Sequence, residues 1–157
     1  MRKHQDSLQR LTRRGLIQTG IATAAALASA ELVAGGEEPG KVTVQPTKKV
    51  ETQKFPWGSI QWLMSGKIDP KAEMTLGIVQ VEPNQANPIH IHPNSAEYLH
   101  MLSGACEHLI DGRWVPLKAG DTVRIPKNVP HGARTKAQPF RAVIVYDTPN
   151  RQMVPVK

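Results

Sequence analysis

The chain has little of several features that mark particular classes of protein. It has one cysteine, Cys106, in 157 residues, so no disulfide can form within the chain. Aromatic residues make up only 4% of it. After residue 30 the single basic cluster is Lys48-Lys49. Nucleic-acid binding is typical of a concentrated basic stripe interleaved with aromatic side chains, so the sequence gives no basis for that function.

No apolar run in the sequence matches a membrane span, which needs about 20 strongly apolar residues. The best candidate, residues 15–30, is rich in Ala, Gly and Thr, contains Gln18, follows a basic head and closes on Ala28-Ser29-Ala30. A basic head, a short apolar stretch and a small-x-small site are typical of a cleaved export signal. Residues 1–30 are therefore predicted to be a signal peptide; a retained anchor is the alternative.

The basic head contains Arg13-Arg14 inside Thr-Arg-Arg-Gly-Leu-Ile. This pattern resembles the twin-arginine export signal, although paired arginines also occur in ordinary secretory signals. Residues 1–30 hold five Lys/Arg and one Asp, a net charge of +4, which leaves 15 Lys/Arg and 12 Asp/Glu, or +3, for residues 31–157. Most of the positive charge thus belongs to the signal. We expect a periplasmic or secreted protein that meets the membrane only during export.

The rest of the chain reads as a tether, one all-β domain and a short tail. Residues 31–54 are rich in Gly, Pro and charge and predict a linker, with a possible edge strand at Val42–Val44. Residues 55–147 contain no amphipathic helix of ten or more residues, and the chain has 13 prolines, which favours short strands and tight corners. We expect strands at residues 59–64, 74–81, 97–102, 105–110, 114–117, 122–125, 133–136 and 140–146, and a tail at 148–157.

Turn residues separate these strands, and Asp111-Gly112 is a strong hairpin signal. Many short strands at this spacing are typical of a sandwich or barrel, including jelly rolls. A domain of this size buries roughly two thirds of its unfolded surface without crosslinks. We expect Cys106 to be a small buried residue rather than a nucleophile, although an odd cysteine in an exported protein could pair between subunits.

One set of side chains could surround a metal ion. His90 and His92 lie on alternate positions of a strand-like run, so they face the same side. Glu97 follows a turn, and His131 comes from a separate segment after Pro130. Imidazole nitrogens suit Fe, Mn, Co, Ni, Cu and Zn, and a carboxylate favours an octahedral ion. Four such ligands would leave two positions for water, oxygen or substrate.

The spacing of this set resembles the two motifs of the cupin superfamily. The first motif is Gly, five residues, His-x-His, three or four residues, Glu, six residues and Gly. It is matched by Asn84, His90, His92, Glu97 and Gly104. The second is Gly, five residues, Pro-x-Gly, two residues, His, three residues and Asn. Its matches are Gly120, Pro126, Asn128, His131 and Thr135, and 15 residues separate the motifs.

The chain departs from the cupin motifs at three positions. Asn84 and Asn128 stand where the motifs have glycine, and asparagine tolerates positive φ better than other residues with side chains. Thr135 replaces the final Asn, so a polar contact there is expected to be rearranged. None of these changes removes a ligand.

The resemblance, which covers residues 57–147, implies a double-stranded β-helix that binds one divalent transition metal (Fe, Mn, Ni, Cu or Zn) through His90, His92, Glu97 and His131. It also implies dioxygenase, decarboxylase or isomerase chemistry on a small organic molecule, and a homodimer is common among proteins of this kind. The alternatives are a metal-free cupin, a non-catalytic protein that binds a small ligand or sugar, and a structural or interaction protein. A proton-transfer group beside the metal would favour the enzyme.

Several residues near the predicted centre decide between these alternatives. Strand alternation places Leu99 and Met101 on the face of Glu97 and His100 on the opposite face. The candidate catalytic residues are His108 and Arg124. His108 could be a general base, although a core or surface position is the simpler interpretation. Arg124 could bind a carboxylate if it pointed inward; we favour an outward, solvated position. The tryptophans are expected in the core or at the rim, with one able to wall the pocket: Trp57, Trp62 and Trp114.

Overall fold

The computed structural model describes residues 44–156. The predicted signal peptide, most of the predicted tether, and Val42 and Thr43 of the possible edge strand lie outside these residues, and Val44 is not part of a strand. Within residues 44–156, no helix is long and apolar enough to cross a membrane.

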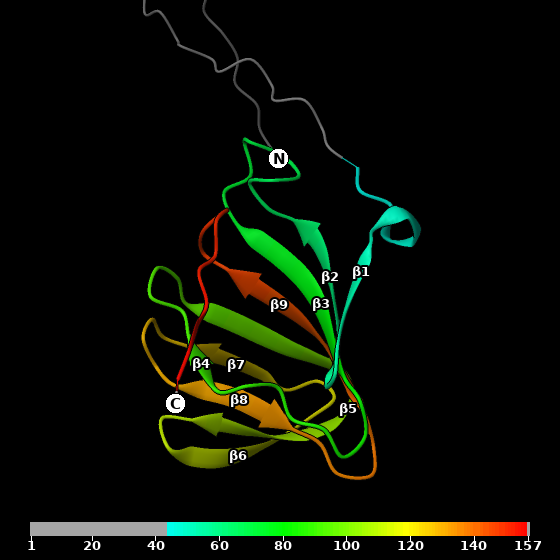
Figure 1. Ribbon diagram of the computed structural model, residues 1–157, viewed down its shortest axis with the longest axis vertical. Coiled ribbons are helices and arrows are strands. Elements are labelled where there is room, and N and C mark those ends of the chain that lie inside the picture. Colours follow the sequence, from blue (N-terminus) through cyan, green and yellow to red (C-terminus); the bar gives the residue numbers. More distant parts are fainter. Residues whose placement is uncertain (1–43, 157) are drawn as a thin grey trace, which may run out of the picture. The chain divides into compact units, whose positions relative to one another are not determined.

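The described part of the chain consists of ten strands and one short 3-10 helix (Figure 1). In chain order the elements are η1 Thr47–Lys49, β1 Thr52–Phe55, β2 Gly58–Met64, β3 Thr75–Val81, β4 His90–Ile91, β5 Glu97–Ile110, β6 Arg113–Lys118, β7 Thr122–Ile125, β8 His131–Arg134, β9 Phe140–Tyr146 and β10 Val154–Pro155. The all-β class predicted from the sequence is confirmed.

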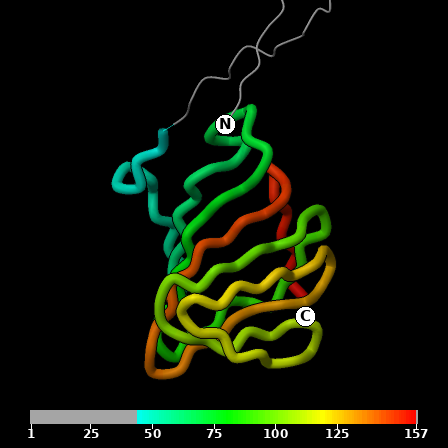
Figure 2. Tube along the Cα trace, turned by 180° about the vertical axis from the view of Figure 1, so that it is seen from behind, coloured from blue at the N-terminus to red at the C-terminus, as the bar shows by residue number. Residues whose placement is uncertain are grey.

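The long strand β5 joins two antiparallel sheets. Its first half pairs with β9 and β7, and β9 continues to β3, β2 and β1. Its second half pairs with β6 and β8, and β8 continues to β4 and β10. Seen from behind, β9 lies between the N-terminal strands and β5 (Figure 2). Two sheets that share a curled strand enclose an interior, as the predicted jelly roll requires.

A bend in β5 allows one strand to serve both sheets. The pairing of β5 with β9 shifts register between Met101 and Ser103, and Gly104 has a φ of 76°. A Cβ on Gly104 would clash with the carbonyl oxygen of Pro139. The sequence suggested two strands, 97–102 and 105–110, because the turn-forming pair Ser103-Gly104 interrupts the apolar pattern. The structure corrects this to one strand with a bulge at that point.

The turn residues adopt the conformations that their types favour. Asp111 and Gly112, between β5 and β6, have φ values of 49° and 75°, which is the positive-φ pair of a tight hairpin. Asn84 and Asn128 have φ values of 57° and 62°, so asparagine does serve in place of glycine there. Thr135 is buried, and its hydroxyl accepts a hydrogen bond from the Gln85 amide at 3.1 Å, tying the loop before β4 to β8.

The core lies between the two sheets and is built by alternation. In β3 and β9 every second residue is buried, and Leu99 and Met101 are buried on the face of Glu97 as expected. Burial of each large aliphatic or aromatic side chain contributes about 1.5–3 kcal/mol. The sheets also extend past the expected limits of the domain. β1 begins at Thr52 rather than near Phe55, and β10 lies in the segment predicted to be a tail.

Candidate metal centre

The four residues predicted as metal ligands come together in the structure. His90 lies in β4, His92 directly follows it, Glu97 begins β5 and His131 begins β8. One ligand atom from each lies within 4.8 Å of the others. His92, Glu97 and His131 are buried, and His90 is half-buried. Backbone pairing of β4 with β8 sets His90 directly opposite His131, which explains why residues 41 positions apart in the sequence share a site.

Each imidazole of the cluster is held by a hydrogen bond on its outer nitrogen. The Nδ1 atoms of His90 and His131 lie 2.7 and 2.8 Å from backbone carbonyl oxygens, and Nδ1 of His92 makes the same kind of contact. The acceptors are the carbonyls of Pro88, Val129 and Gln152, respectively. A carbonyl only accepts, so each Nδ1 carries the proton. All three Nε2 atoms are thereby left as ligands, in the tautomer that metal-binding histidines need.

The carboxylate of Glu97 faces these nitrogens. Its Oε2 lies 3.1 Å from Nε2 of His92 and 3.2 Å from Nε2 of His131. A carboxylate and two bare lone pairs would repel one another, so the cluster needs positive charge at its centre. Although burial opposes the charge on His131, the hydrogen bond and charge of Glu97 outweigh it and raise the pKa of His131. Burial likewise opposes ionisation of Glu97, but the bonds from His131 and His92 hold its pKa well below the usual value.

His90 behaves differently from His131. Burial, and then the charge of His131, lower the pKa of His90 to about 4. His90 is therefore neutral at physiological pH and offers its lone pair without losing a proton. Three convergent Nε2 atoms and one carboxylate fit a divalent transition metal, which would supply the positive charge that a proton supplies otherwise. The ion would be held by His90, His92, Glu97 and His131.

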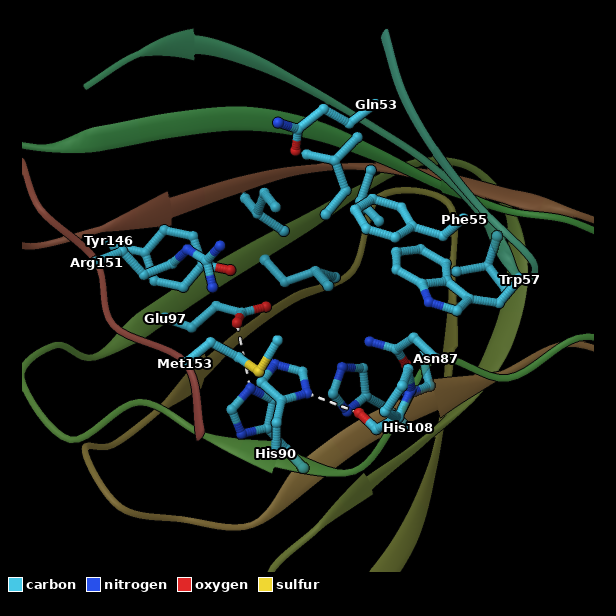
Figure 3. Close-up of a pocket in the computed structure, with 18 of the residues that line it drawn as sticks. Gln53, Phe55, Trp57, Asn87, His90, Glu97, His108, Tyr146, Arg151 and Met153 are labelled. Carbon is cyan, nitrogen blue, oxygen red and sulfur yellow. Dashed lines mark hydrogen bonds and ion pairs between the residues drawn. The ribbon is translucent and has the colours of Figure 1, made fainter. Parts of the chain in front are cut away.

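The cluster lies at one side of a mostly apolar cavity of about 200 Å³. Both sheets and the segment after β9 contribute to its walls (Figure 3). The apolar side chains include Phe55 and Trp57, which stack at 4.8 Å between ring centroids, across the cavity from Glu97. The polar residues of the lining include Gln53, Asn87, His108, Tyr146 and Arg151. A small organic molecule that is apolar over most of its surface fits such a site.

His108 points into this cavity, which the sequence left undecided. The side chain is 3% exposed, and its ring centroid lies 6.1 Å from that of His131. The bulge in β5 explains the orientation. Before it the odd-numbered residues face inward, from Glu97 to Met101; after it the even-numbered ones do, and these include Cys106 and His108. His108 is therefore buried, as the core interpretation expected, and it lies in the wall of the cavity.

The other candidate catalytic residue, Arg124, lies outside the site. Its Nε donates a hydrogen bond to the Tyr98 hydroxyl at 3.3 Å on the exposed face of the sheet, as the favoured interpretation predicted. His100 is also exposed and bonds with Thr122. Cys106 is buried, as expected, and burial raises the pKa of its thiol to about 12, which disfavours the thiolate form that a nucleophile needs.

Aromatic and C-terminal residues complete the site. Trp57 and Trp62 line the cavity, whereas Trp114 is 43% exposed and packs against Arg134. Tyr146 is buried with its ring 4.8 Å from that of His92. Burial, reinforced by the charge of Glu97, raises the pKa of Tyr146 well above its usual value, so its hydroxyl remains a donor.

Sequence reasoning missed Arg151, Met153 and the carbonyl of Gln152, which all reach the site from the expected tail. A polar segment without strand pattern gives no signal of where it packs. The nearest clue was the apolar Met-Val-Pro-Val run near the C-terminus.

Comparison with known proteins agrees with this architecture. Residues 77–146 match the family model of the cupin domain. Protein SchB from Streptomyces halstedii is 36% identical over 59 residues, which make up 38% of this chain and 43% of SchB. The aligned segment thus spans less than half of that relative.

Two solved structures show the same fold. The polyketide cyclase RemF from Streptomyces resistomycificus is 21% identical with a TM-score of 0.63, over 74% of this chain and 87% of that one. The oxalate decarboxylase from Lactobacillus farciminis is 21% identical with a TM-score of 0.64, over 69% of this chain and 34% of that one. At this identity the likeness shows the fold alone. The family match, the jelly-roll fold and the three-histidine, one-glutamate cluster together support placing this domain in the cupin superfamily.

Proposed function

We propose that the protein is a metal-dependent enzyme that acts on a small, mostly apolar organic molecule. The observation that carries the proposal is the juxtaposition of the cluster of His90, His92, Glu97 and His131 with an apolar cavity that also holds His108. A divalent ion bound by the cluster would act as a Lewis acid toward a substrate oxygen. The protein supplies the apolar walls that orient the substrate and a side chain that can move a proton.

His108 is suited to accept that proton. Its Nδ1 lies 3.2 Å from the carbonyl oxygen of Leu109, so Nδ1 carries the hydrogen and Nε2 keeps its lone pair. Burial lowers the pKa of His108, which keeps the ring neutral at physiological pH. Histidine is the most frequent general base of enzymes.

The simplest reaction for this arrangement is proton abstraction next to a carbonyl group. The C–H bond breaks, its proton moves to Nε2 of His108, and the bonding electrons pass toward the carbonyl oxygen to give the enolate. Where the enolate is conjugated with a carbon–carbon double bond, return of the proton to another carbon completes an isomerisation. Attack of the enolate carbon on a second carbonyl closes a ring, and the new alkoxide takes the proton back from His108. In a decarboxylation the bond between the carbon and a carboxylate breaks instead, carbon dioxide leaves, and the resulting enolate takes a proton from water.

The wall of the cavity favours a carbon-rich substrate. Most of its lining side chains are aliphatic or aromatic. A diacid as small as oxalate has no apolar surface to pack against them. RemF, a polyketide cyclase, shares the fold over nearly its whole length. We therefore propose an oxygenated, polyketide-like substrate with an enolisable carbonyl.

Hydrogen exchange of a probe ketone tests this function. β-Tetralone, an enolisable bicyclic ketone, is incubated in D₂O with the metal-loaded protein, and deuterium uptake is followed by NMR. Exchange should need the metal and should fall by roughly a hundredfold or more in His108→Asn, as expected for loss of a general base. The outward Arg124→Gln serves as the matched control and should behave as the wild type.

Three results would contradict the proposed chemistry. Deuterium exchange that continues after the metal is removed with a chelator would show that the reaction does not need a Lewis acid. Metal-dependent binding of β-tetralone without exchange would identify a non-catalytic ligand-binding protein, the main alternative. Oxygen consumption during turnover, measured with an oxygen electrode, would indicate a dioxygenase instead.

Export and dimer formation are also proposed on the sequence alone. Residues 1–30 have the pattern of a twin-arginine-like signal, so the Arg13→Lys, Arg14→Lys double variant should accumulate in the cytoplasm of a bacterial host that has this export system. Equal export of both forms, measured by cell fractionation, would contradict it.

Analytical ultracentrifugation tests the homodimer, and a monomer at micromolar concentration would contradict that proposal.

A further inference from the structure

Arg151 lies in the wall of the cavity and is held there by two aromatic rings. The carbon of its guanidinium group lies 4.6 Å from the ring centroid of Trp62 and 5.1 Å from that of Tyr146. Figure 3 shows Arg151 beside Tyr146, on the same side of the cavity as Glu97. Tyr146 also contacts the ring of His92, so a single aromatic side chain links the arginine with the metal cluster.

The guanidinium group of Arg151 is not paired with an anion in the described part of the chain. Within residues 44–156, the ion pairs made by arginine and lysine side chains are those of Arg134 and Lys136 with Glu107. The Arg151 side chain makes no hydrogen bond to any of the same residues. Glu97, the acidic residue of the cavity, is engaged by His92 and His131. Arg151 therefore brings a positive charge and free donors to a cavity that is mostly apolar.

The backbone around Arg151 is fixed on both sides. The side chain of Asn94 donates to the carbonyl of Asn150 at 2.8 Å and accepts from the amide of Gln152 at 2.9 Å. The amide of Gly66 donates to the carbonyl of Pro149 at 2.9 Å. The guanidinium carbon lies close to both aromatic rings. A guanidinium group presents its N–H donors in a planar fork that matches the two oxygens of a carboxylate.

Arg151 also stands where the cavity meets the surface. Together with Gln53 and Trp62 it lines both the cavity and an adjoining hollow that contains Ser65 and Lys67. A molecule that passes from this hollow toward the metal cluster would meet Arg151 on the way. A charged group at this point can hold one end of a substrate while its apolar body fills the cavity.

We propose that Arg151 is a specificity-determining residue that binds a carboxylate on the substrate. The substrate class is accordingly an apolar organic acid, with the carboxylate on Arg151 and its other oxygen groups toward the metal ligands. This inference rests on the proposed function for the presence of a substrate in the cavity. From the sequence, Arg124 is a candidate for the role of binding a carboxylate. The proposal assigns that role to Arg151, which the sequence does not identify.

A charge-matched pair of probes tests the inference. Isothermal titration calorimetry measures binding of naphthoate and of the neutral naphthamide to the full-length protein, both metal-loaded and stripped with a chelator. The ratio of the two affinities should fall roughly tenfold or more in Arg151→Gln, as expected for a lost hydrogen bond between two charged groups. Binding of naphthamide should change by less than about twofold. Arg151→Lys should retain part of the preference for the acid.

The controls separate this inference from the proposed function and from damage to the fold. Arg124→Gln removes an arginine that also lies near a tyrosine ring, outside the cavity, and should leave the ratio unchanged. A general loss of structure would also weaken the binding of naphthamide, so retained naphthamide binding shows that the variant is folded. An unchanged ratio in Arg151→Gln, with naphthamide binding retained, would overturn the inference. A protein that binds no metal would refute the proposed function, whereas the ratio in the stripped protein would still decide the role of Arg151.

Discussion

The histidines of the cluster are oriented before any ion arrives. Backbone carbonyls accept the Nδ1 hydrogens of His90, His92 and His131. These hydrogen bonds fix the tautomer of each ring, so the three Nε2 atoms are the ones available to a metal ion. Such outer hydrogen bonds typically change metal affinity 10–100-fold when they are removed. The carbonyls themselves cannot be mutated, which makes the shape of the backbone part of the metal site.

The raised pKa of His131 predicts proton release on metal binding. Below this pKa, His131 holds a proton that the metal must displace, so affinity weakens as pH falls. Above it the ring is already neutral, and affinity becomes independent of pH as far as His131 is concerned. His90, with a pKa of about 4, contributes no proton near neutrality. We therefore expect metal binding at pH 6 to release the proton that His131 holds.

Calorimetry in buffers of different ionisation enthalpy measures this proton directly. Replacing His131 by Gln should abolish the release together with most of the affinity. Metal binding at pH 6 with no proton released would mean that the pair of His131 and Glu97 is not protonated in the metal-free protein.

At the scale of the element, the segment after β9 is part of the metal centre. Asn94 clamps it through two hydrogen bonds, and β10 pairs with β4, which carries His90. The carbonyl of Gln152 orients His92. Ligand orientation therefore depends on a segment about sixty residues further along the chain.

We predict that Asn94→Ala weakens metal binding roughly tenfold, because the carbonyl that orients His92 loses its anchor. Competition with a chromophoric chelator measures the affinity. Asn94→Asp, which keeps only the acceptor for the Gln152 amide, should give an intermediate loss. If Asn94→Ala bound metal as tightly as the wild type, the segment would have no part in orienting His92.

The bend of β5 gives a second prediction at this scale. Gly104→Ala combines a φ of 76° with a clash against Pro139, so it should cost more than the ~1–2 kcal/mol of left-handed backbone strain alone. Gly120→Ala is the matched control, since φ there is 90° and a Cβ meets nothing within 4 Å. Urea denaturation compares the free energies of unfolding, and equal losses would contradict the close contact at Gly104.

For the whole molecule, local spacing in the sequence predicted the ligands but not the wall around them. His90, His92, Glu97 and His131 follow from motif spacing, and the orientation of Leu99 and Met101 follows from strand alternation. His108 could not be placed, because Ser103-Gly104 marks an interruption in the sequence but does not show that a bulge there changes which face of β5 is buried. Arg151 and Gln152 could not be placed because their positions depend on contacts with Asn94 and Trp62, which lie far away in the sequence.

The most direct test of the account is the metal content of the full-length protein, measured by elemental analysis after purification without added chelator. We predict one first-row transition metal ion per chain in the wild type and in His100→Ala, whose histidine is exposed and bonded to Thr122. His131→Ala should lose most of the metal. The same metal content in His131→Ala as in the wild type, or no transition metal in the wild type, would contradict the central claim that these four side chains form a metal centre.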